Sequence, residues 1–527
     1  MADSGFRQDV RDILKADRGP YRTRFRIVAI VISVLLVLAV AGGATWYRYS
    51  CGFSDDLSRG GLTGTCYGVT NGSHIFADNL RGIEKKIHTQ NRKVTHSGHY
   101  VTVAFYTPMA VGPGETELPE TILHDLQGAF VAQWRVNHTT AISGDEPKIR
   151  LVLADPGSKA KHWKEVADML RNHIGKPDNL VAVTGLGTST KATKNFIRRM
   201  SANHVAMVGS VITSTDLNGT AFPGLIRVAP TNQDEALAAI NALPHSVRTA
   251  MLVQDRNRTD NYVTTLGSAF AARIKATGRK VVGQVETYSS GLENPGGRFA
   301  QIANAVCLVR PDVVLFAGRG PKLGDFVQAL GNRTCTDFPV TVISGDDASK
   351  VVFDRNGELA AALNGTRNVK PVTLEYTALA HPDTWTGVGA NAGAASCPSA
   401  ALGDSRGDVV ENYRRFLRDY QRSGLGQPSS DALVDGEAIM SHDAVLTATR
   451  AIRSELPQGR TIPIPSAEQV TQNLAGLHLD NSVPGASGTI AIDDAGNPEN
   501  KPIPFVELKG NRTVSFLQLT CPDAPTR

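Results

Sequence analysis

Three consecutive hydroxyl residues, Thr188, Ser189 and Thr190, stand where an apolar run at 179–185 gives way to an amphipathic segment at 190–200. A turn that leads from a strand into a helix presents hydroxyls and backbone N–H groups at the positive end of the helix dipole, where a carboxylate binds well. The same hydroxyls can instead cap the helix by accepting a hydrogen bond from its first turn. The pattern therefore predicts an anion-binding turn and leaves simple N-capping by Ser189 or Thr190 open.

Signatures of catalysis are missing from the sequence. It contains no phosphate-binding G-x-x-x-x-G-K-[ST] loop, no H-E-x-x-H pair and no G-x-S-x-G nucleophile turn. His96 and His99 have a spacing that could hold one edge of a metal site, but no Cys, Asp or Glu completes a coordination shell nearby. We therefore expect no catalytic residue, no cofactor and no metal. A hydrolase with a Ser, His and Asp triad assembled from distant positions is the weakest alternative.

Short apolar runs alternate with amphipathic segments of a dozen or more residues from Tyr100 onward. Continuous apolar strands of this kind are typical of parallel sheets that helices cover on both faces. The sequence predicts an α/β fold of the doubly wound type, divided into two sheets near 227–235 because one sheet rarely needs ten strands. The apolar runs are 100–107, 148–155, 179–185, 204–210, 249–255, 280–288, 312–318 and 338–347.

The charge of the chain and its longest apolar segment both lie near the N-terminus. The 527 residues carry a net charge of +5, and residues 1–26 hold seven basic and four acidic residues. Residues 27–47 have no charge and, at about 1.5 Å per residue, are long enough to span a bilayer core. We expect a basic cytosolic tail, a single-pass anchor in the cell membrane and an outer part that begins with a stalk at 48–98. A cleaved secretory signal is the alternative, and nothing in the charge balance indicates nucleic acid.

Six cysteines all lie beyond the apolar segment, where disulfides are permitted. Proximity in the sequence predicts the bridges Cys51–Cys66 and Cys307–Cys335, and leaves Cys397 and Cys521 to pair or stay free. Buried free thiols are the alternative. No pair has the C-x-x-C spacing of a zinc ribbon or a thiol oxidoreductase.

The order of strands and turns resembles that of the type I periplasmic binding proteins, in particular the branched-chain amino-acid-binding components of ABC transporters. The similarity runs from about Tyr100 to Leu519, and its most specific part is the segment GASGTIAIDDAGNP at 485–498. The resemblance implies two lobes that are joined by three crossings and close on a ligand like a hinge. The first lobe is expected from 99–231 and 384–497, and the second from 232–383 and 498–520.

The resemblance also implies where a ligand would bind. A second hydroxyl turn, at Ile212, Thr213 and Ser214, matches the family's turn that helps to hold the carboxylate and amino groups of the ligand. Asp346 matches the acidic residue that grips the ammonium group of amino acids, and a solvated turn is the alternative for this residue. Tyr106 matches an aromatic region that lines the pocket, and a tyrosine in the core of the lobe is an equally good account.

Two departures from the family weaken the assignment to amino acids. Arg319 stands where the family often has an aromatic residue, and the turn after the fifth strand, 259–262, lacks the family's Tyr-Gly pair. An arginine in the cleft would favour a further carboxylate or phosphate on the ligand, because its planar fork binds them bidentately. A solvated surface position is the alternative for Arg319.

The function that this resemblance implies is the capture of a small ligand, an amino acid by default, with amides and other anionic small molecules left open. In a transport receptor the loaded lobes would deliver the ligand to an ABC permease. In a sensor ectodomain, closure would instead alter a contact with a signalling partner in the membrane. The basic tail fits a sensor and also fits a plain topology signal.

Overall fold

A computed structural model gives the fold of the chain. The described part of the chain divides into two compact units, Met1–Cys66 and Tyr67–Arg527, and each is treated by itself. The described residues are 27–39, 42, 51, 56–60, 64–112, 115, 117–140, 142–291, 295–386, 406–454, 463–478 and 481–522.

The first unit contains a helical segment at 27–39, whose side chains are exposed, and strand β1 (Leu57–Arg59). Cys51 and Cys66 form a disulfide with their Cα atoms 5.6 Å apart, which confirms this predicted bridge. The predicted anchor at 27–47 extends into residues outside the described ranges. Among the helices described, none is both long enough and apolar enough to cross a membrane.

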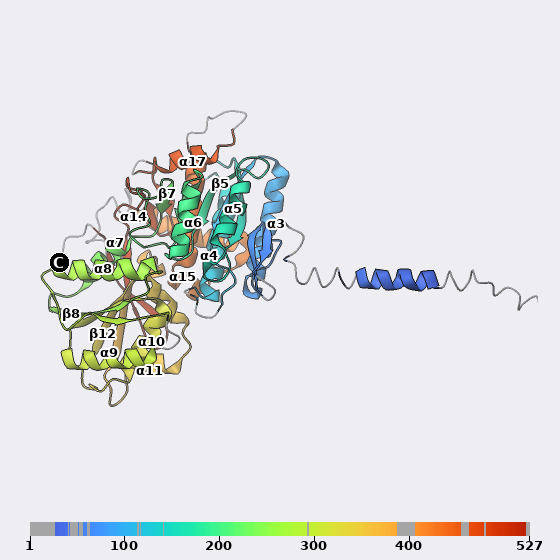
Figure 1. The fold of residues 1–527 in the computed structure, drawn as a ribbon. Helices are drawn as coiled ribbons and strands as arrows, with labels where there is room; N and C mark the ends of the chain where they lie inside the picture. Colours follow the sequence, from blue (N-terminus) through green and yellow to red (C-terminus); the bar gives the residue numbers. More distant parts are fainter. Residues whose placement is uncertain are drawn as a thin grey trace, which may run out of the picture. The chain divides into compact units, whose positions relative to one another are not determined.

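The first of two large sheets in the second unit has the strand order β2-β4-β3-β5-β6-β7. β2 runs antiparallel to β4, and the other neighbours are parallel. Helices cover both faces, with α5 and α6 on one and the remaining helices of this layer on the other (Figure 1). The strands are β2 (Cys66–Thr70), β3 (Tyr100–Tyr106), β4 (Lys148–Asp155), β5 (Leu180–Gly185), β6 (Ala206–Gly209) and β7 (Leu225–Arg227). The helices are α3 (Arg81–Ser97), α4 (Pro119–His138), α5 (Trp163–Asn172), α6 (Lys191–Ser201), α14 (Arg406–Tyr420), α16 (Glu437–Arg453) and α17 (Ala467–Leu474).

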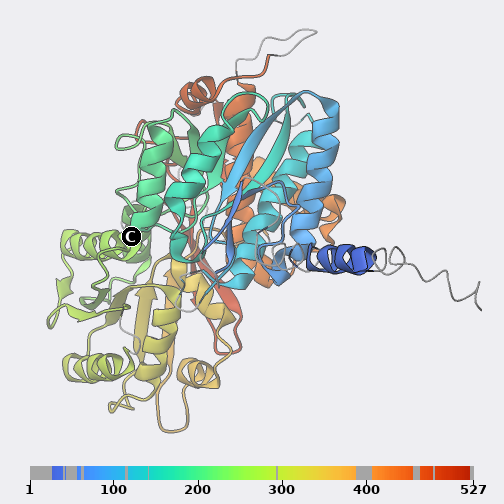
Figure 2. The ribbon, with the colours of Figure 1, turned by 45° about the vertical axis from the view of Figure 1, so that its right-hand side comes forward.

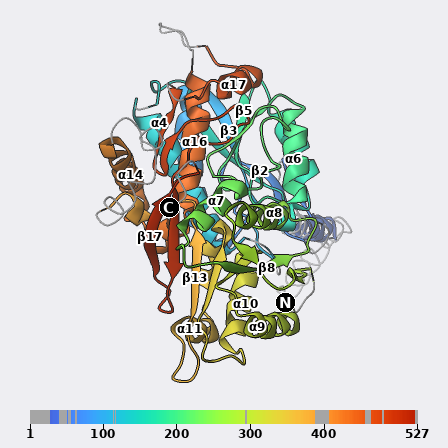
Figure 3. The ribbon, with the colours of Figure 1, turned by 90° about the vertical axis from the view of Figure 1, so that its left-hand side faces the viewer.

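The second sheet has the order β10-β8-β11-β12-β13-β16-β17, with β9 beside β8. Its strands are parallel as far as β13, and β16 and β17 are antiparallel (Figure 3). Helices α7 and α8 cover one face, and α9, α10 and α11 cover the other. The strands are β8 (Thr249–Asp255), β9 (Lys280–Val281), β10 (Glu286–Tyr288), β11 (Val313–Ala317), β12 (Val340–Ser344), β13 (Val372–Thr377), β16 (Ile503–Leu508) and β17 (Val514–Thr520). The helices are α7 (Asn232–Ala242), α8 (Asn261–Ala276), α9 (Gly296–Val309), α10 (Gly320–Gly331) and α11 (Gly357–Asn364).

The chain passes between these two layers three times: after β7, after β13 and before β16 (Figure 2). The first passage lies within 227–235, where the sequence predicts the division. We call the first sheet with its helices lobe 1 and the second sheet with its helices lobe 2. The predicted doubly wound α/β architecture is confirmed.

The short elements are η1 (Asp78–Leu80), η2 (Ser158–Ala160), η3 (Asp346–Phe353), η4 (Pro382–Thr384), η5 (Gln421–Leu425), α15 (Asp431–Val434), β14 (Val483–Gly485) and β15 (Gly488–Ile490).

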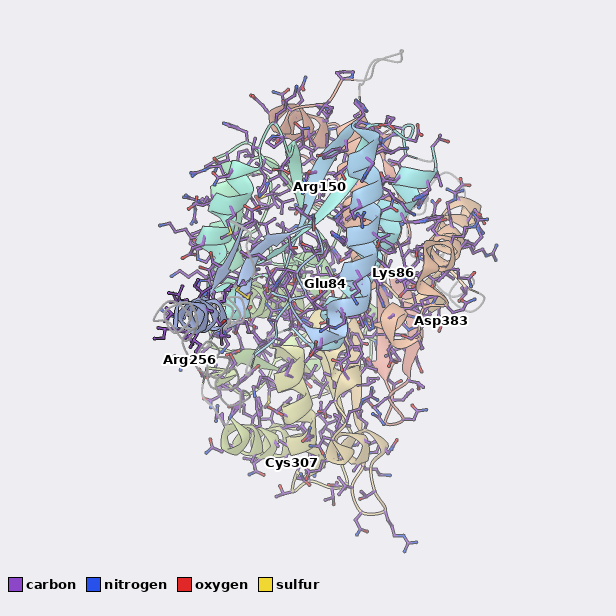
Figure 4. All side chains as sticks on the ribbon, turned by 90° about the vertical axis from the view of Figure 1, so that its right-hand side faces the viewer. Glu84, Lys86, Arg150, Arg256, Cys307 and Asp383 are labelled. Carbon is purple, nitrogen blue, oxygen red and sulfur yellow. A yellow bond between two sulfur atoms is a disulfide. The ribbon has the colours of Figure 1, made fainter. Side chains whose placement is uncertain are left out.

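The predicted stalk at 48–98 is wrong for its second half. Strand β2 pairs with β4, with Gly68 opposite Asp155, so it extends the first sheet. Helix α3, which carries Glu84 in Figure 4, buries Ile83 and Ile87 in the core of lobe 1. An amphipathic helix needs an apolar partner, and the adjacent sheet supplies it. The Gly- and Asn-rich composition before α3 concealed the strand.

The second predicted bridge, Cys307–Cys335, is also confirmed. It joins the end of α9 to the segment after α10, with the Cα atoms 5.4 Å apart (Figure 4). Cys521 is disulfide-bonded as well, and Cys397 lies outside the described residues. In the described part of the chain no cysteine is free.

Candidate functional site

Turns that follow parallel strands of both sheets meet in one region between the lobes. In lobe 1, the turns at 186–190 and 210–214 follow β5 and β6. In lobe 2, the turns at 256–260, at Arg319 and at 345–347 follow β8, β11 and β12. Ligands of doubly wound proteins bind at this carboxyl edge of the strands. The topology therefore places most of the predicted site residues around one cleft.

Four of the predicted residues lie together across this cleft. The backbone N–H of Ser214 donates to Ser189 Oγ at 3.2 Å, which joins the two hydroxyl turns of lobe 1. Thr213 Oγ1 donates to Asp346 Oδ1 of lobe 2 at 3.4 Å. All four side chains are buried, so the solvated alternative for Asp346 is wrong. Hydroxyls from one lobe thus face a carboxyl group of the other.

The first hydroxyl turn also performs the capping that was left open. Thr190 Oγ1 accepts a hydrogen bond from the N–H of Thr193 at 3.3 Å and so caps α6. The carbonyl of Thr188 accepts from Thr193 Oγ1 at 2.6 Å, which ties the turn to the helix. Ser189, in contrast, directs its hydroxyl to the second turn. Of the two capping candidates, Thr190 caps the helix and Ser189 faces the second turn.

Tyr106 and Ile212 lie in the core of lobe 1. The Tyr106 ring stacks on Phe196 of α6 with the ring centroids 3.7 Å apart, and the residue is fully buried. Ile212 is also fully buried in the same apolar cluster. These contacts support the core account of Tyr106. Ile212 takes part in the site through its backbone carbonyl.

A buried arginine lies behind the second hydroxyl turn. Arg227, the last residue of β7, donates from Nη1 to the carbonyls of Ile212 at 3.1 Å and of Ser214 at 2.9 Å. Its Nε and Nη2 have no hydrogen-bond partner among the described residues. Burial lowers the pKa of Arg227 to about 10, so the guanidinium stays charged at neutral pH. The turn therefore has a positive charge directly behind it.

On the opposite side of the cleft, Asp346 forms a pair with Glu235. Glu235 Oε2 accepts from the backbone N–H of Asp346 at 2.8 Å and from Thr377 Oγ1 at 2.9 Å, so the Glu235 carboxyl group lies against the 345–347 turn. Burial and the neighbouring negative charges raise the pKa of Asp346 to about 6, and they raise the pKa of Glu235 as well. Two buried carboxyl groups that repel each other cannot easily both ionise, so the pair tends to hold a proton.

Glycine is required next to this carboxyl pair. A Cβ atom at Gly345 would lie 2.8 Å from Glu235 Oε2 and 2.6 Å from the hydroxyl of Tyr262. Both distances are shorter than van der Waals contact permits. The close approach of the 345–347 turn to α7 and α8 therefore depends on the absence of a side chain at this position.

Arg319 is neither solvated nor directed at a ligand. Its side chain makes two hydrogen bonds of 2.8 Å to Asp260 and one of 3.1 Å to Asp347. Its guanidinium carbon lies 4.4 Å from the centroid of the Tyr262 ring. The residue is buried, so the surface alternative is wrong. Because protein carboxylates already bind the guanidinium, Arg319 gives no support to a further anion on the ligand.

A buried ion pair connects the lobes beside this network. Lys350 of η3 lies 2.8 Å from Asp347 Oδ1 in its own lobe and 3.1 Å from Oε2 of Glu117, which precedes α4 in lobe 1. The backbones also meet, since the N–H groups of Asn261 and Tyr262 donate to the Ser189 carbonyl at 3.1 and 3.2 Å. The described arrangement is therefore one in which the lobes are closed on each other.

Comparison with known proteins places this geometry in a fold family. The sequence matches no family model and no curated protein. Solved structures do match. A leucine-binding protein from Thermotoga maritima is 20% identical, with a TM-score of 0.53 over 80% of this chain and 99% of that chain. The substrate-binding protein LivJ from Streptococcus pneumoniae, in complex with isoleucine, is 15% identical, with a TM-score of 0.55 over 80% and 99%. A solute-binding protein from R. palustris, in complex with 4-hydroxybenzoate, is 14% identical, with a TM-score of 0.55 over 80% and 96%.

The chain has the type I periplasmic-binding fold. Within this fold, the sequence did not lead us to four charged residues around the cleft: Arg227, Glu235, Asp260 and Lys350. One signal was present, because Arg227 interrupts the apolar run LIRVAP, and a charge inside a buried strand requires a specific partner. The other three lie in helix starts and turns, where charged residues are common. Their burial depends on how the two lobes of the periplasmic-binding fold meet.

Proposed function

We propose that this protein is an extracytoplasmic solute-binding protein that captures an amino acid between its two lobes. The observation that carries the proposal is the opposite charge on the two sides of the cleft. Arg227 stands behind the turn that holds Thr213 and Ser214, and the Glu235–Asp346 pair faces this turn from lobe 2. A ligand with a carboxylate at one end and an ammonium group at the other matches both sides.

The carboxyl pair argues against a ligand that is only an anion. An ammonium group can replace a proton held by Glu235 or Asp346, whose pKa values are both raised, whereas a bare carboxylate would add a further negative group to the same region. Two of the solved structures of this fold are described as leucine-binding or bound to isoleucine, and another holds 4-hydroxybenzoate, which has no amino group. The charges in this cleft favour the amino-acid class over the benzoate class.

The proposal also covers delivery of the ligand to a permease and attachment of the protein to the membrane. We propose that the closed, loaded lobes dock on an ABC permease and release the amino acid to it. The uncharged segment at 27–47, preceded by a basic tail, supports a single-pass anchor that holds the binding lobes on the outer face of the cell membrane. A tether of this kind keeps the binding protein near its permease and raises its effective concentration there.

A thermal-shift panel on the full chain in detergent tests the proposal. The panel contains the common amino acids, their primary amides, sugars and aromatic or aliphatic carboxylates. A ligand present at a hundred times its dissociation constant stabilises the protein by about 2.7 kcal/mol, which is a clear shift of the melting temperature. We expect at least one amino acid to give this shift, and the Asp346→Asn variant to lose it. Shifts from sugars or simple carboxylates alone would overturn the amino-acid assignment.

A further inference from the structure

We propose that Arg227 is a positioning residue that makes the 212–215 turn selective for a carboxylate. Arg227 does not touch the ligand in this account. It acts by orienting the backbone of the turn and by placing a positive charge behind it. The inference rests on the proposed function, because it assumes that the ligand has a carboxylate at this end.

The orientation follows from the geometry of the peptide bond. The carbonyls of Ile212 and Ser214 both point toward Arg227 Nη1, at 3.1 and 2.9 Å. In a trans peptide the N–H of the following residue points the opposite way. The N–H groups of Thr213 and Thr215 are therefore directed away from Arg227, and neither donates to another of the described residues. Thr213 is fully buried, and an unpaired N–H in such a residue indicates a water or ligand partner.

The charge of Arg227 lacks a direct counter-ion. Asp234, Asp216 and Asp493 act on it electrostatically, but none of them forms an ion pair with it in the described part of the chain. Each has other partners. Asp216 binds Lys194 at 2.5 Å, Asp234 accepts from Thr231 at 2.8 Å, and Asp493 accepts from the N–H of Asn497 at 2.7 Å.

A buried cation without a contacting anion stabilises any negative group that binds near it, since little solvent lies between the charges. The N–H groups of Thr213 and Thr215 point to the side of the turn that faces away from Arg227. Hydrogen bonds from these groups and the charge behind them favour the same ligand chemistry, a carboxylate. The two hydroxyls of the turn alone would hold an amide almost as well.

The test compares a carboxylate with its neutral amide in variants of the full chain. Isothermal titration in detergent gives the dissociation constants of L-leucine and L-leucinamide for the wild type, Arg227→Gln and Arg227→Lys. Arg333→Gln is the matched control. Arg333 is also a buried arginine that donates to carbonyls, 2.8 Å from Leu330 and 2.7 Å from Lys370, but it follows the C-terminal end of α10, whereas Arg319 precedes the N-terminal end of this helix.

We expect Arg227→Gln to weaken leucine at least tenfold and to change leucinamide less than threefold, so that the preference for the carboxylate collapses. Arg227→Lys keeps the positive charge but loses the planar guanidinium that orients the two carbonyls. It should therefore retain part of the preference for leucine over leucinamide. It also serves as the second variant if Arg227→Gln does not fold. Arg333→Gln should leave the preference unchanged.

Failure of the role of Arg227 and failure of the proposed function would give different results. If the wild type binds leucine and the folded Arg227 variants weaken leucine and leucinamide by the same factor, or change neither, the role of Arg227 is overturned while the proposed function stands. If the wild type binds no amino acid in the panel described above, the proposed function itself fails.

Discussion

Lys350 of lobe 2 lies 3.1 Å from Glu117 of lobe 1, and both side chains are almost completely buried. Lys350 also binds Asp347 at 2.8 Å, so one ammonium group holds carboxylates from both lobes. These carboxylates raise the pKa of Lys350 above its ordinary value, which keeps it charged in the closed protein. The closed arrangement therefore depends on a buried ion pair as well as on backbone contacts across the cleft.

Removal of this ammonium group should destabilise the protein strongly. Lys350→Met leaves Glu117 buried without its cation and leaves Asp347 with Arg319 alone, and loss of one partner of a buried pair typically costs about 3–5 kcal/mol. Glu117→Gln should cost less, because Lys350 keeps Asp347. Urea unfolding measures both. The control is Lys322→Met, which removes a partly exposed ion pair with Asp325 and should change stability by less than about 1 kcal/mol. Equal effects of Lys350→Met and Lys322→Met would contradict the importance of the interlobe pair.

The Glu235–Asp346 pair predicts how stability depends on pH in the absence of ligand. The pKa of Asp346 is raised from 3.8 to about 6, so the folded state binds this proton more tightly than the unfolded state does. Stability from this group is therefore present at about pH 4 and is lost as the pH rises toward and through 6. Asp346→Asn removes this titrating carboxyl group and leaves Glu235 in place. We expect the variant to match the wild type near pH 4 and to exceed it by about 2 kcal/mol at pH 7 in urea unfolding. A variant that is less stable than the wild type at both pH values would contradict this account.

Ligand binding should release a proton that the Glu235–Asp346 pair holds, because both pKa values are raised. An ammonium group between Glu235 and Asp346 favours the ionised carboxylates, so acid opposes binding. Below about pH 6 we expect the dissociation constant of the amino acid to rise, by up to about tenfold per pH unit. Titration in two buffers with different enthalpies of ionisation gives the number of protons released. Affinity that stays constant from pH 7 to pH 4.5, with no proton release, would show that the ligand's ammonium group does not bind there.

Gly345→Ala should weaken ligand binding, because the site has no space for a methyl group at this position. The new methyl group would lie 2.6 Å from the Tyr262 hydroxyl and 2.8 Å from Glu235 Oε2, so it must displace the carboxyl pair or the turn. We expect amino-acid affinity to fall at least tenfold in isothermal titration. Gly357→Ala, at the start of α11, is the control, because its methyl group would meet no atom within 4 Å. Similar affinities for the two variants would mean that this close approach is not needed for binding.

Much of the fold was predictable because apolar runs and amphipathic segments alternate with a clear period. The strand ends are equally clear, and in parallel sheets they determine where a cleft lies. Ser189 was found for this reason, whereas Thr213, Ser214 and Asp346 were assigned from the resemblance to the periplasmic binding proteins. Strand β2 was missed because its five residues follow a Gly-rich segment and include one glycine, so no periodic pattern stands out.

Charges in the cleft were harder to predict, because their partners are distant in the sequence. Arg319 binds Asp260, 59 positions away, and Lys350 binds Glu117 in the other lobe. A sequence shows a charged residue, but only the packed structure shows whether another charge satisfies it. For the same reason Arg319 was expected to favour a ligand anion, whereas Arg227, which has no ion-pair partner among the residues that the structure describes, was not considered.

The most direct test of the central claim is isothermal titration of the full chain with three ligands of one shape: L-leucine, L-leucinamide and 4-methylpentanoate. The first has both charged groups, the second lacks the carboxylate and the third lacks the ammonium group. The account predicts that leucine binds at least tenfold more tightly than either analogue. Binding of 4-methylpentanoate as tight as that of leucine would contradict it, because the Glu235–Asp346 pair would then have no ligand to recognise.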